Sequence, residues 1–287
     1  MKYILILSIM YLPLSGSAQR IHADLYGGVA NYSGDLQGKR YTFSNSGAML
    51  GLGMSYDINN KFIVRGVATY LNVQGDDKNN TTATGVTYRN LNFKSHVLEA
   101  QLALEYNFFD ISERSFTPYI FAGVAAFHFN PYSYDTLGNK FLLRPLSTEG
   151  EGLAAYPDKK PYNNKQIAIP FGGGLKFVLS DRIQLSVEVG LRKLFTDYLD
   201  DVSTTYADSS LLLAAKGPTA VEFAYRGNEL KGGPGYPAAG SQRGNAKNKD
   251  WYYTTGIHVS YLFGAGNGNG TGKGKKGNHL GCPIRVY

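Results

Sequence analysis

The chain has 287 residues, 43% hydrophobic and 18% charged, and this composition excludes a protein that is disordered throughout. Its 35 glycines, 22 tyrosines and 15 phenylalanines are typical of β-structure, in which aromatic rings pack on strands and glycine occupies bends. The slightly negative mean hydropathy argues against a bundle of membrane helices, and the formal net charge of +7 does not by itself indicate a partner.

The first 18 residues have the features of an export signal. Lys2 gives a positive start, residues 3–14 form a short apolar core, and residues 16–18 are small enough for cleavage. The apolar run is shorter than the roughly 20 residues that a membrane-spanning helix needs. We therefore expect residues 1–18 to be a cleaved signal peptide, and export argues against a nucleic-acid partner.

From residue 21 onward, apolar residues recur at every second position, which is the period of a strand with one apolar face. The pattern is clearest in residues 183–192, where five aliphatic residues alternate with polar residues or glycine. Each segment is long enough for a tilted membrane strand, which needs about 9–11 residues. The eight predicted strands are residues 21–32, 48–58, 62–74, 98–108, 117–130, 167–177, 183–192 and 249–263.

The connections between these strands alternate strictly between long and short. The short ones are residues 59–61, 109–116 and 180–182, and the long ones are residues 33–47, 75–91, 131–165 and 197–248. Outer-membrane barrels sort their connections in this way, with short periplasmic turns and long external loops. The sequence therefore predicts an all-β fold: an eight-stranded antiparallel transmembrane up-and-down β-barrel with long extracellular loops and both termini in the periplasm.

The polar positions of the predicted strands carry charges of both signs. A soluble sandwich or lipocalin-like barrel would point its apolar face inward, whereas in a membrane barrel these charges face an enclosed centre. Isolated charges are costly to bury, but acids and bases inside a narrow barrel can pair with one another. We expect a packed polar core with a structural role, formed by Arg65, Glu99, Glu105, Lys176, Glu188 and Arg192.

No motif for catalysis is present: G-x-S-x-G, H-E-x-x-H and cysteine clusters are all missing from the sequence. We therefore expect no enzymatic activity, no cofactor and no metal, although a Ser–His pair from different strands stays open. Asp197, Asp200 and Asp201 lie together in the last long loop and are candidate partner-binding residues. Calcium binding and helix capping are alternative roles for these aspartates, although the spacing of the three residues does not match an EF-hand. His96, on the outward face near the external rim, suits a lipid headgroup contact.

The chain ends in a segment of different character. Residues 264–277 alternate glycine with Asn, Thr and Lys, which predicts a flexible basic linker, and Leu280, Cys282 and Pro283 follow as candidate partner-binding residues. A single cysteine in an oxidising compartment suggests pairing between molecules. We expect residues 264–287 to be a periplasmic tail in which Cys282 forms a disulfide with a periplasmic partner; an inert disordered extension is the alternative.

Six strings give a family resemblance that runs over nearly all of residues 21–263. They are GDL (34–36), RNLNFK (89–94), PFGGGLK (170–176), RKLFTDYLDDVSTTY (192–206), QRGN (242–245) and DWYY (250–253). With these strings the chain resembles the PorG family, outer-membrane β-barrels of the type IX secretion system of Bacteroidota. The resemblance implies a barrel associated with a periplasmic ring of PorK lipoprotein and PorN, needed for protein export and, in gliding species, for motility. It brings no catalytic residues.

These observations predict three parts: a signal peptide (1–18), a barrel anchored in outer-membrane lipid (19–263) and a periplasmic tail (264–287). The expected function is non-enzymatic, anchoring or organising the periplasmic ring at the outer membrane. The alternative is a small surface barrel for adhesion or lipid A modification. A diffusion pore is a third possibility, which a filled interior would exclude.

Overall fold

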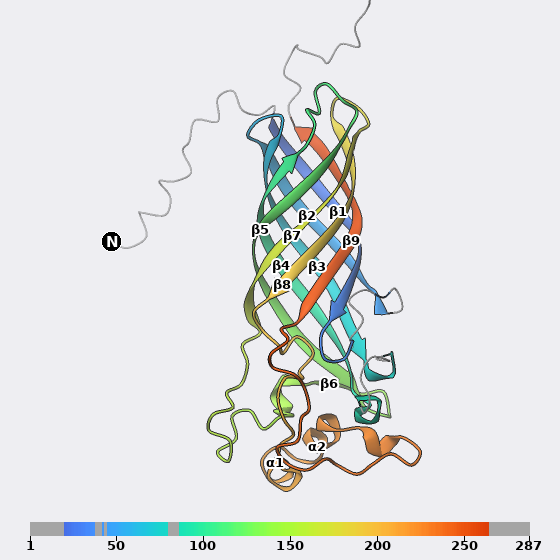
Figure 1. The fold of residues 1–287 in the computed structure, drawn as a ribbon, viewed down its shortest axis with the longest axis vertical. Helices are drawn as coiled ribbons and strands as arrows, with labels where there is room; N and C mark the ends of the chain where they lie inside the picture. Colours follow the sequence, from blue (N-terminus) through green and yellow to red (C-terminus); the bar gives the residue numbers. More distant parts are fainter. Residues whose placement is uncertain (1–19, 38–41, 43–44, 80–85, 264–287) are drawn as a thin grey trace, which may run out of the picture.

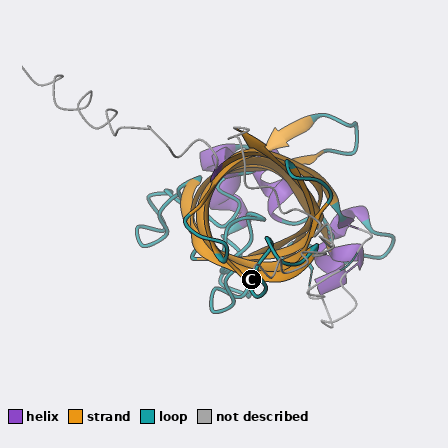
Figure 2. Cartoon of the chain, turned by 90° about the horizontal axis from the view of Figure 1, so that it is seen from above, coloured by secondary structure: helices purple, strands orange, loops and turns teal. Residues whose placement is uncertain are grey.

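The computed structural model describes residues 20–37, 42, 45–79 and 86–263, and eight of its strands form one closed barrel (Figure 1). Each strand pairs antiparallel with two neighbours, and the ring closes where β1 pairs with β9 and β4 pairs with β5. Figure 2 shows the ring from its end. The predicted eight-stranded antiparallel barrel is confirmed. Its strands are β1 (Ile21–Ser33), β2 (Gly47–Asp57), β3 (Phe62–Asp76), β4 (Asn92–Asn107), β5 (Phe116–Tyr134), β7 (Lys165–Val178), β8 (Ile183–Leu194) and β9 (Trp251–Phe263).

Most strand ends lie within two residues of their predicted positions, but β4 and β5 extend further than that. β4 begins at Asn92 instead of residue 98, and β5 continues to Tyr134, where it pairs with the short strand β6 (Lys140–Leu142) beside the barrel. The extra residues of β4 carry polar side chains outward, Lys94 and His96, while Phe93 faces inward. The apolar-outward pattern that marks a membrane strand is therefore missing from this extension.

Short turns and long connections lie at opposite ends of the barrel. Ile21 pairs with Phe263, so the start of β1 and the end of β9 both lie at the short-turn end. At the other end the long connections fold together into a cap, which we define as the described residues between 34 and 46, 77 and 91, 135 and 164, and 195 and 250 (Figure 1). The predicted signal peptide and tail lie outside the described residues.

The cap contains short helices. They are α1 (Ser209–Lys216), α2 (Pro218–Ala224) and the 3₁₀ turns η4 (Asp77–Asn79), η5 (Val86–Arg89), η6 (Arg144–Leu146) and η7 (Gly227–Glu229). Asp208 begins α1 by accepting hydrogen bonds from the backbone N–H groups of Ser210 and Leu211. Gly217, with φ of 85°, allows the chain to turn into α2. Among the described residues, no helix has the length and apolarity needed to cross a membrane.

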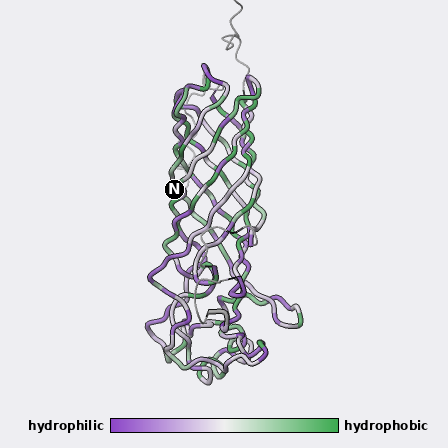
Figure 3. Tube along the Cα trace, turned by 45° about the vertical axis from the view of Figure 1, so that its right-hand side comes forward, coloured by the Kyte–Doolittle hydropathy of each residue, from purple (hydrophilic) through white to green (hydrophobic). Residues whose placement is uncertain are grey.

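The outside of the barrel is an apolar belt, and hydrophobic residues recur along its strands in Figure 3. Leu52 is 65% exposed and Ile167 is 62% exposed, values that water would disfavour but lipid would not. At the short-turn end the belt finishes in exposed rings, as in the aromatic girdles of outer-membrane barrels. These rings are Tyr56, Phe62, Phe108, Phe116, Phe177, Tyr261 and Phe263.

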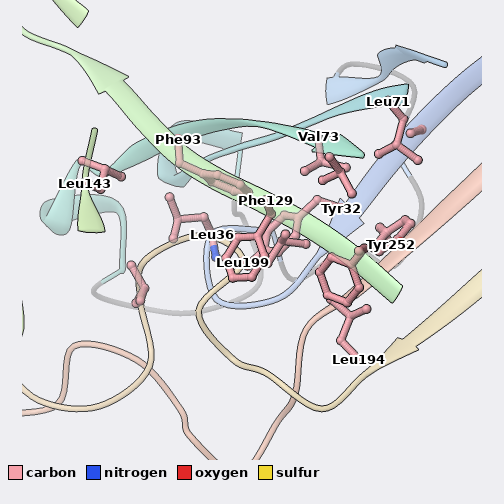
Figure 4. Close-up of a cluster of buried hydrophobic side chains, with 14 of the residues drawn as sticks. Tyr32, Leu36, Leu71, Val73, Phe93, Phe129, Leu143, Leu194, Leu199 and Tyr252 are labelled. Carbon is pink, nitrogen blue, oxygen red and sulfur yellow. Dashed lines mark hydrogen bonds between the residues drawn. The ribbon is translucent and has the colours of Figure 1, made fainter. Parts of the chain in front are cut away.

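The hydrophobic core lies at the opposite end, where barrel and cap meet. Figure 4 shows Tyr32, Phe93 and Phe129 from the strands together with Leu36 and Leu199 from the cap, all buried in one cluster. A smaller cluster inside the cap contains Leu153, Leu212, Ala220 and Ala224. The cap is therefore packed onto the barrel mouth rather than extended into solvent.

We predict that Leu102→Lys lowers the free energy of unfolding in lipid vesicles by about 2–4 kcal/mol, because it places a charge in the middle of the belt. Urea titration of the vesicle-inserted protein measures this. His96→Lys, on the same strand and the same face but beyond the belt, is the matched control and should cost less than about 1 kcal/mol. Equal losses at the two positions would contradict a lipid-facing belt.

Candidate functional site

The interior of the barrel holds a network of buried ion pairs. The guanidinium of Arg65 contacts Glu188 at 2.6 Å and Glu105 at 3.3 Å, and Lys176 pairs with the other oxygen of Glu105. The Tyr119 hydroxyl donates to Glu188 at 2.8 Å. These groups come from β3, β4, β5, β7 and β8, so the network ties together strands on different sides of the ring.

A second set of pairs lies nearer the cap. Arg192 donates to both oxygens of Glu99, at 3.1 and 3.3 Å, and to Thr254 at 2.5 Å. The Tyr252 hydroxyl donates to Glu99 at 2.5 Å. The structure thus places all six charged residues expected in the interior, three acids and three bases, inside the barrel and in contact with opposite charges. Removing one partner of such a pair leaves an uncompensated charge.

The space between the two sets of pairs is nearly filled. The void lined by Arg65, Gln101, Glu188 and Arg192 has a volume of about 20 Å³. That volume holds about one water molecule. This part of the interior offers a solute no passage.

One arrangement inside the barrel near the short-turn end has the residue types of a hydrolase triad. His258, Asp24 and Ser260 are buried together, but the Asp24 carboxylate, at 3.1 Å, and the Ser260 hydroxyl, at 2.9 Å, both contact the same nitrogen, Nε2 of His258. In a catalytic triad the imidazole contacts the serine and the acid through different nitrogens. Among the residues that the structure describes, Nδ1 of His258 has no hydrogen-bond partner, and Tyr26 stacks on the ring at 4.0 Å. The geometry does not match a proton relay.

In the cap, two buried arginines connect distant segments. Arg89 forms a two-pronged contact with Asp77, at 2.6 and 2.8 Å, and donates to the carbonyls of Asp35, at 2.9 Å, and Arg243. Arg243 donates to Glu149 at 3.1 Å and to the carbonyl of Asp201 at 2.6 Å. We call this set, with the backbone N–H of Asn245 donating to Asp35 at 2.9 Å, the arginine network.

Asp197, Asp200 and Asp201 are buried beside the arginine network, which corrects the expectation that they present a surface to a partner. Asp201 accepts hydrogen bonds from Thr148 and Tyr162, both at 2.6 Å, so its carboxylate is used within the cap. Asp200 accepts from the Tyr32 hydroxyl and Asp197 from Ser203. None of the three caps a helix, since Asp208 has that role. The described residues contain no group of three ligands that could hold a metal ion.

Buried carboxyls make the cap sensitive to protons. Burial raises the pKa of Asp197 to about 7, that of Glu151 to about 7 and that of Asp201 to about 6, although the neighbouring Arg243 lowers the last two. Burial raises the pKa of Asp250 well above its usual range, and the nearby carboxylates of Asp200 and Asp197 raise it further. The cap therefore holds more carboxyls than it can keep charged at low cost.

Sequence reasoning missed the arginine network, but the strings that gave the family resemblance contain most of it. Four strings meet there: residues 34–36, 89–94, 192–206 and 242–245 supply Asp35, Arg89, Asp201, Arg243 and Asn245. The fifth, residues 250–253, supplies Asp250, which lies outside the network beside Asp200 and accepts a hydrogen bond from the backbone N–H of Leu199. The sixth, residues 170–176, lies on β7 and provides Lys176. Leu280, Cys282 and Pro283 lie outside the described residues.

The apolar belt, the paired interior and the sorting of turns and loops occur together in proteins that span the outer membrane. The chain is a small outer-membrane β-barrel. A family model described as a domain of unknown function, DUF6089, matches residues 1–141, just under half of the 287 residues. No curated protein matches the sequence.

Solved structures similar to the chain are small bacterial outer-membrane proteins. Neisserial surface protein A is 10% identical over 85% of this chain and 97% of its own, with a TM-score of 0.39. OprG from Pseudomonas aeruginosa is 14% identical over 85% and 97%, with a TM-score of 0.40. Outer membrane protein W of E. coli is 16% identical over 85% and 99%, with a TM-score of 0.35.

We predict that Arg192→Ala lowers the free energy of unfolding by about 3–5 kcal/mol, because Glu99 is left buried without its partner. The double variant Glu99→Gln/Arg192→Met removes both charges and should recover most of that loss. Urea unfolding in vesicles compares the two proteins. A double variant less stable than the single one would show that the ion pair is not the origin of the effect.

We also predict that the cap becomes less stable as pH rises from about 4 to about 7. The pKa values of Asp197 and Glu151 are higher in the folded cap than in the unfolded chain, so folding takes up protons in this window and stability falls as they are lost. Hydrogen exchange at the backbone N–H groups of residues 199–204, corrected for intrinsic rates, should be faster at pH 8 than at pH 5.

Glu151→Gln should flatten this pH dependence. Asp208→Asn is the control, because Asp208 lies outside the buried cluster and hydrogen bonds to Ser210 and Leu211 lower its pKa. If hydrogen exchange in Glu151→Gln depended on pH as in the wild type, the Glu151 carboxyl would not be the cause of that dependence.

Proposed function

We propose that the chain is a non-enzymatic component of the type IX secretion system that anchors or organises the periplasmic ring of PorK and PorN at the outer membrane. The observation that carries the proposal is the meeting of four resemblance strings in the arginine network. These strings are far apart in the sequence but lie in one buried network. This supports a resemblance that reflects a shared cap structure and not separate chance matches. A filled interior fits a scaffold better than a pore.

The position of the chain ends supports the same role. Phe263 pairs with Ile21 at the short-turn end, which in outer-membrane barrels faces the periplasm. The last described residue, Phe263, therefore lies at the end of the barrel where a periplasmic ring would lie. In this proposal the tail, with Leu280, Cys282 and Pro283, contacts the ring, and Cys282 forms a disulfide with a ring protein.

Affinity isolation of the tagged full chain from native membranes tests this proposal. PorK and PorN should be recovered with the wild-type protein and lost when residues 264–287 are replaced by a Gly/Ser segment of equal length. Cys282→Ser should remove a slower band from non-reducing gels without unfolding the barrel, as judged by the mobility of unheated samples. Recovery of the ring proteins without the tail would contradict tail docking, and their absence from every isolate would contradict the secretion role.

A surface-binding role in adhesion is the second candidate, favoured by a groove in the cap. The groove has a volume of about 630 Å³ and lies between the two helices, lined by apolar and polar side chains that include Leu213, Val221, Glu222, Tyr225 and Tyr236. The helices that line it, α1 and α2, lie at the end of the molecule opposite the short turns (Figure 1). This role predicts that the chain is isolated without periplasmic partners, so the same experiment separates the two functions.

A further inference from the structure

Four neighbouring strands carry basic but no acidic side chains on the outside of the barrel rim beneath the cap. On β4, β5, β7 and β8, four consecutive neighbours in the ring, the outward positions contain no acidic residue. Basic side chains follow directly after the last apolar position of three of these strands: His96 after Leu98, Lys165 after Ile167, and Lys193 after Leu191. We define the basic arc as Lys94, His96, His128, Lys140, Lys165 and Lys193, all of which are exposed.

The lysines of the arc are not neutralised by acidic side chains of the described residues. Two acids lie near the arc, Asp76 at the end of β3 and Asp135 directly after β5. Asp76 accepts from the backbone N–H of Lys78, and Asp135 accepts from that of Asn139. The arc therefore presents positive charge to whatever surrounds the barrel.

Aromatic side chains hold one part of the arc in place. The ammonium of Lys140 lies 3.6 Å from the centre of the Tyr132 ring, and that of Lys94 lies 5.8 Å from the centre of the Tyr134 ring. His96 is packed between Tyr132, at 5.2 Å, and Tyr70, at 5.7 Å. Cations held over rings at the edge of an apolar belt are suited to bind an anionic group at the level of the lipid headgroups.

The opposite rim is different. Its strand ends and turns carry four basic and four acidic residues, so the two signs balance. They are Arg20, Lys61, Arg114 and Arg182 with Asp57, Asp110, Glu113 and Asp181. The excess of positive charge is thus confined to the end with the long connections, which in an outer-membrane barrel faces the outside. The lipid of that leaflet is the phosphorylated glycolipid lipid A.

We propose that the basic arc binds the phosphates of lipid A in the outer leaflet, with Lys94, Lys140 and His96 forming the most ordered part of the site. The lysines neutralise the phosphates, and the tyrosine hydroxyls next to them supply further hydrogen bonds. The lipid then contacts the belt through its acyl chains and the arc through its headgroup. This site is independent of the proposed role in secretion.

Competition in vesicles tests the proposal. The full chain is inserted into phosphatidylcholine vesicles with dansyl-labelled lipid A, and energy transfer from Trp251, the only tryptophan, reports lipid at the barrel surface. Unlabelled lipid A should displace the label about tenfold better than dephosphorylated lipid A or phosphatidylglycerol. Equal displacement by the dephosphorylated form would overturn phosphate recognition, and equal displacement by phosphatidylglycerol would overturn the choice of lipid A.

Matched variants locate the site. Lys94→Gln/Lys140→Gln/Lys165→Gln should lose the preference for phosphorylated lipid A, whereas Lys94→Arg/Lys140→Arg/Lys165→Arg should keep it. Lys61→Gln/Arg114→Gln/Arg182→Gln removes the same charge from the opposite rim and should behave like wild type. The mobility of unheated samples shows that each variant is folded. Loss of the preference in the opposite-rim variant, or its survival in the first variant, would contradict the arc as the binding site.

Discussion

The structure depends on one constraint: charged side chains that point into a closed, narrow ring must find partners there. The barrel can show lipid an apolar surface only because its polar residues face inward, and inside the ring there is little water to solvate them. Arg65, Lys176 and Arg192 meet this constraint by contacting carboxylates from other strands. These contacts link different sides of the barrel wall. The same ion pairs therefore neutralise the buried charges and hold the strands in place.

The cap meets a similar constraint in a different way. Its backbone has little regular structure to satisfy its hydrogen bonds, and side chains supply much of what strands supply elsewhere. Arg89 and Arg243 donate to carbonyl groups as well as to carboxylates, and Glu149 accepts from the backbone N–H groups of Ser203 and Thr204. Burial of several carboxyls makes this arrangement depend on protons. The cap is ordered, but its stability depends on the protonation of these carboxyls. The barrel wall is instead held by continuous strand pairing.

The fold was predictable because most strands repeat one simple rule, apolar outward and polar inward, over ten or more residues. β5 departs from the rule, since Phe121, Phe127 and Phe129 face inward while most of its outward positions are also apolar. That rule also placed Glu99 and Arg192 correctly inside the barrel before any pairing was known. It could not place the arginine network, because contacts such as Arg243 with Glu149 join loops 94 residues apart and follow no period. It likewise gave no sign that Asp200 would be buried under Tyr32 rather than exposed. In the first residues of β4, up to His96, the outward side chains are polar. The alternation therefore gave no sign that the strand begins before residue 98.

Closure of the ring between β1 and β9 has a consequence for assembly. The register joins Ile21 to Phe263, so the contact that removes the last open edge has one of the largest sequence separations in the chain. Contacts of this kind form slowly, because the entropy of a very long loop must be lost before any pairing is gained. Until residues 251–263 have been delivered, every intermediate exposes two unpaired edges that can bind other chains. The final strand is thus the segment that an assembly factor would have to present, and a nascent chain arrested before it would be prone to aggregate.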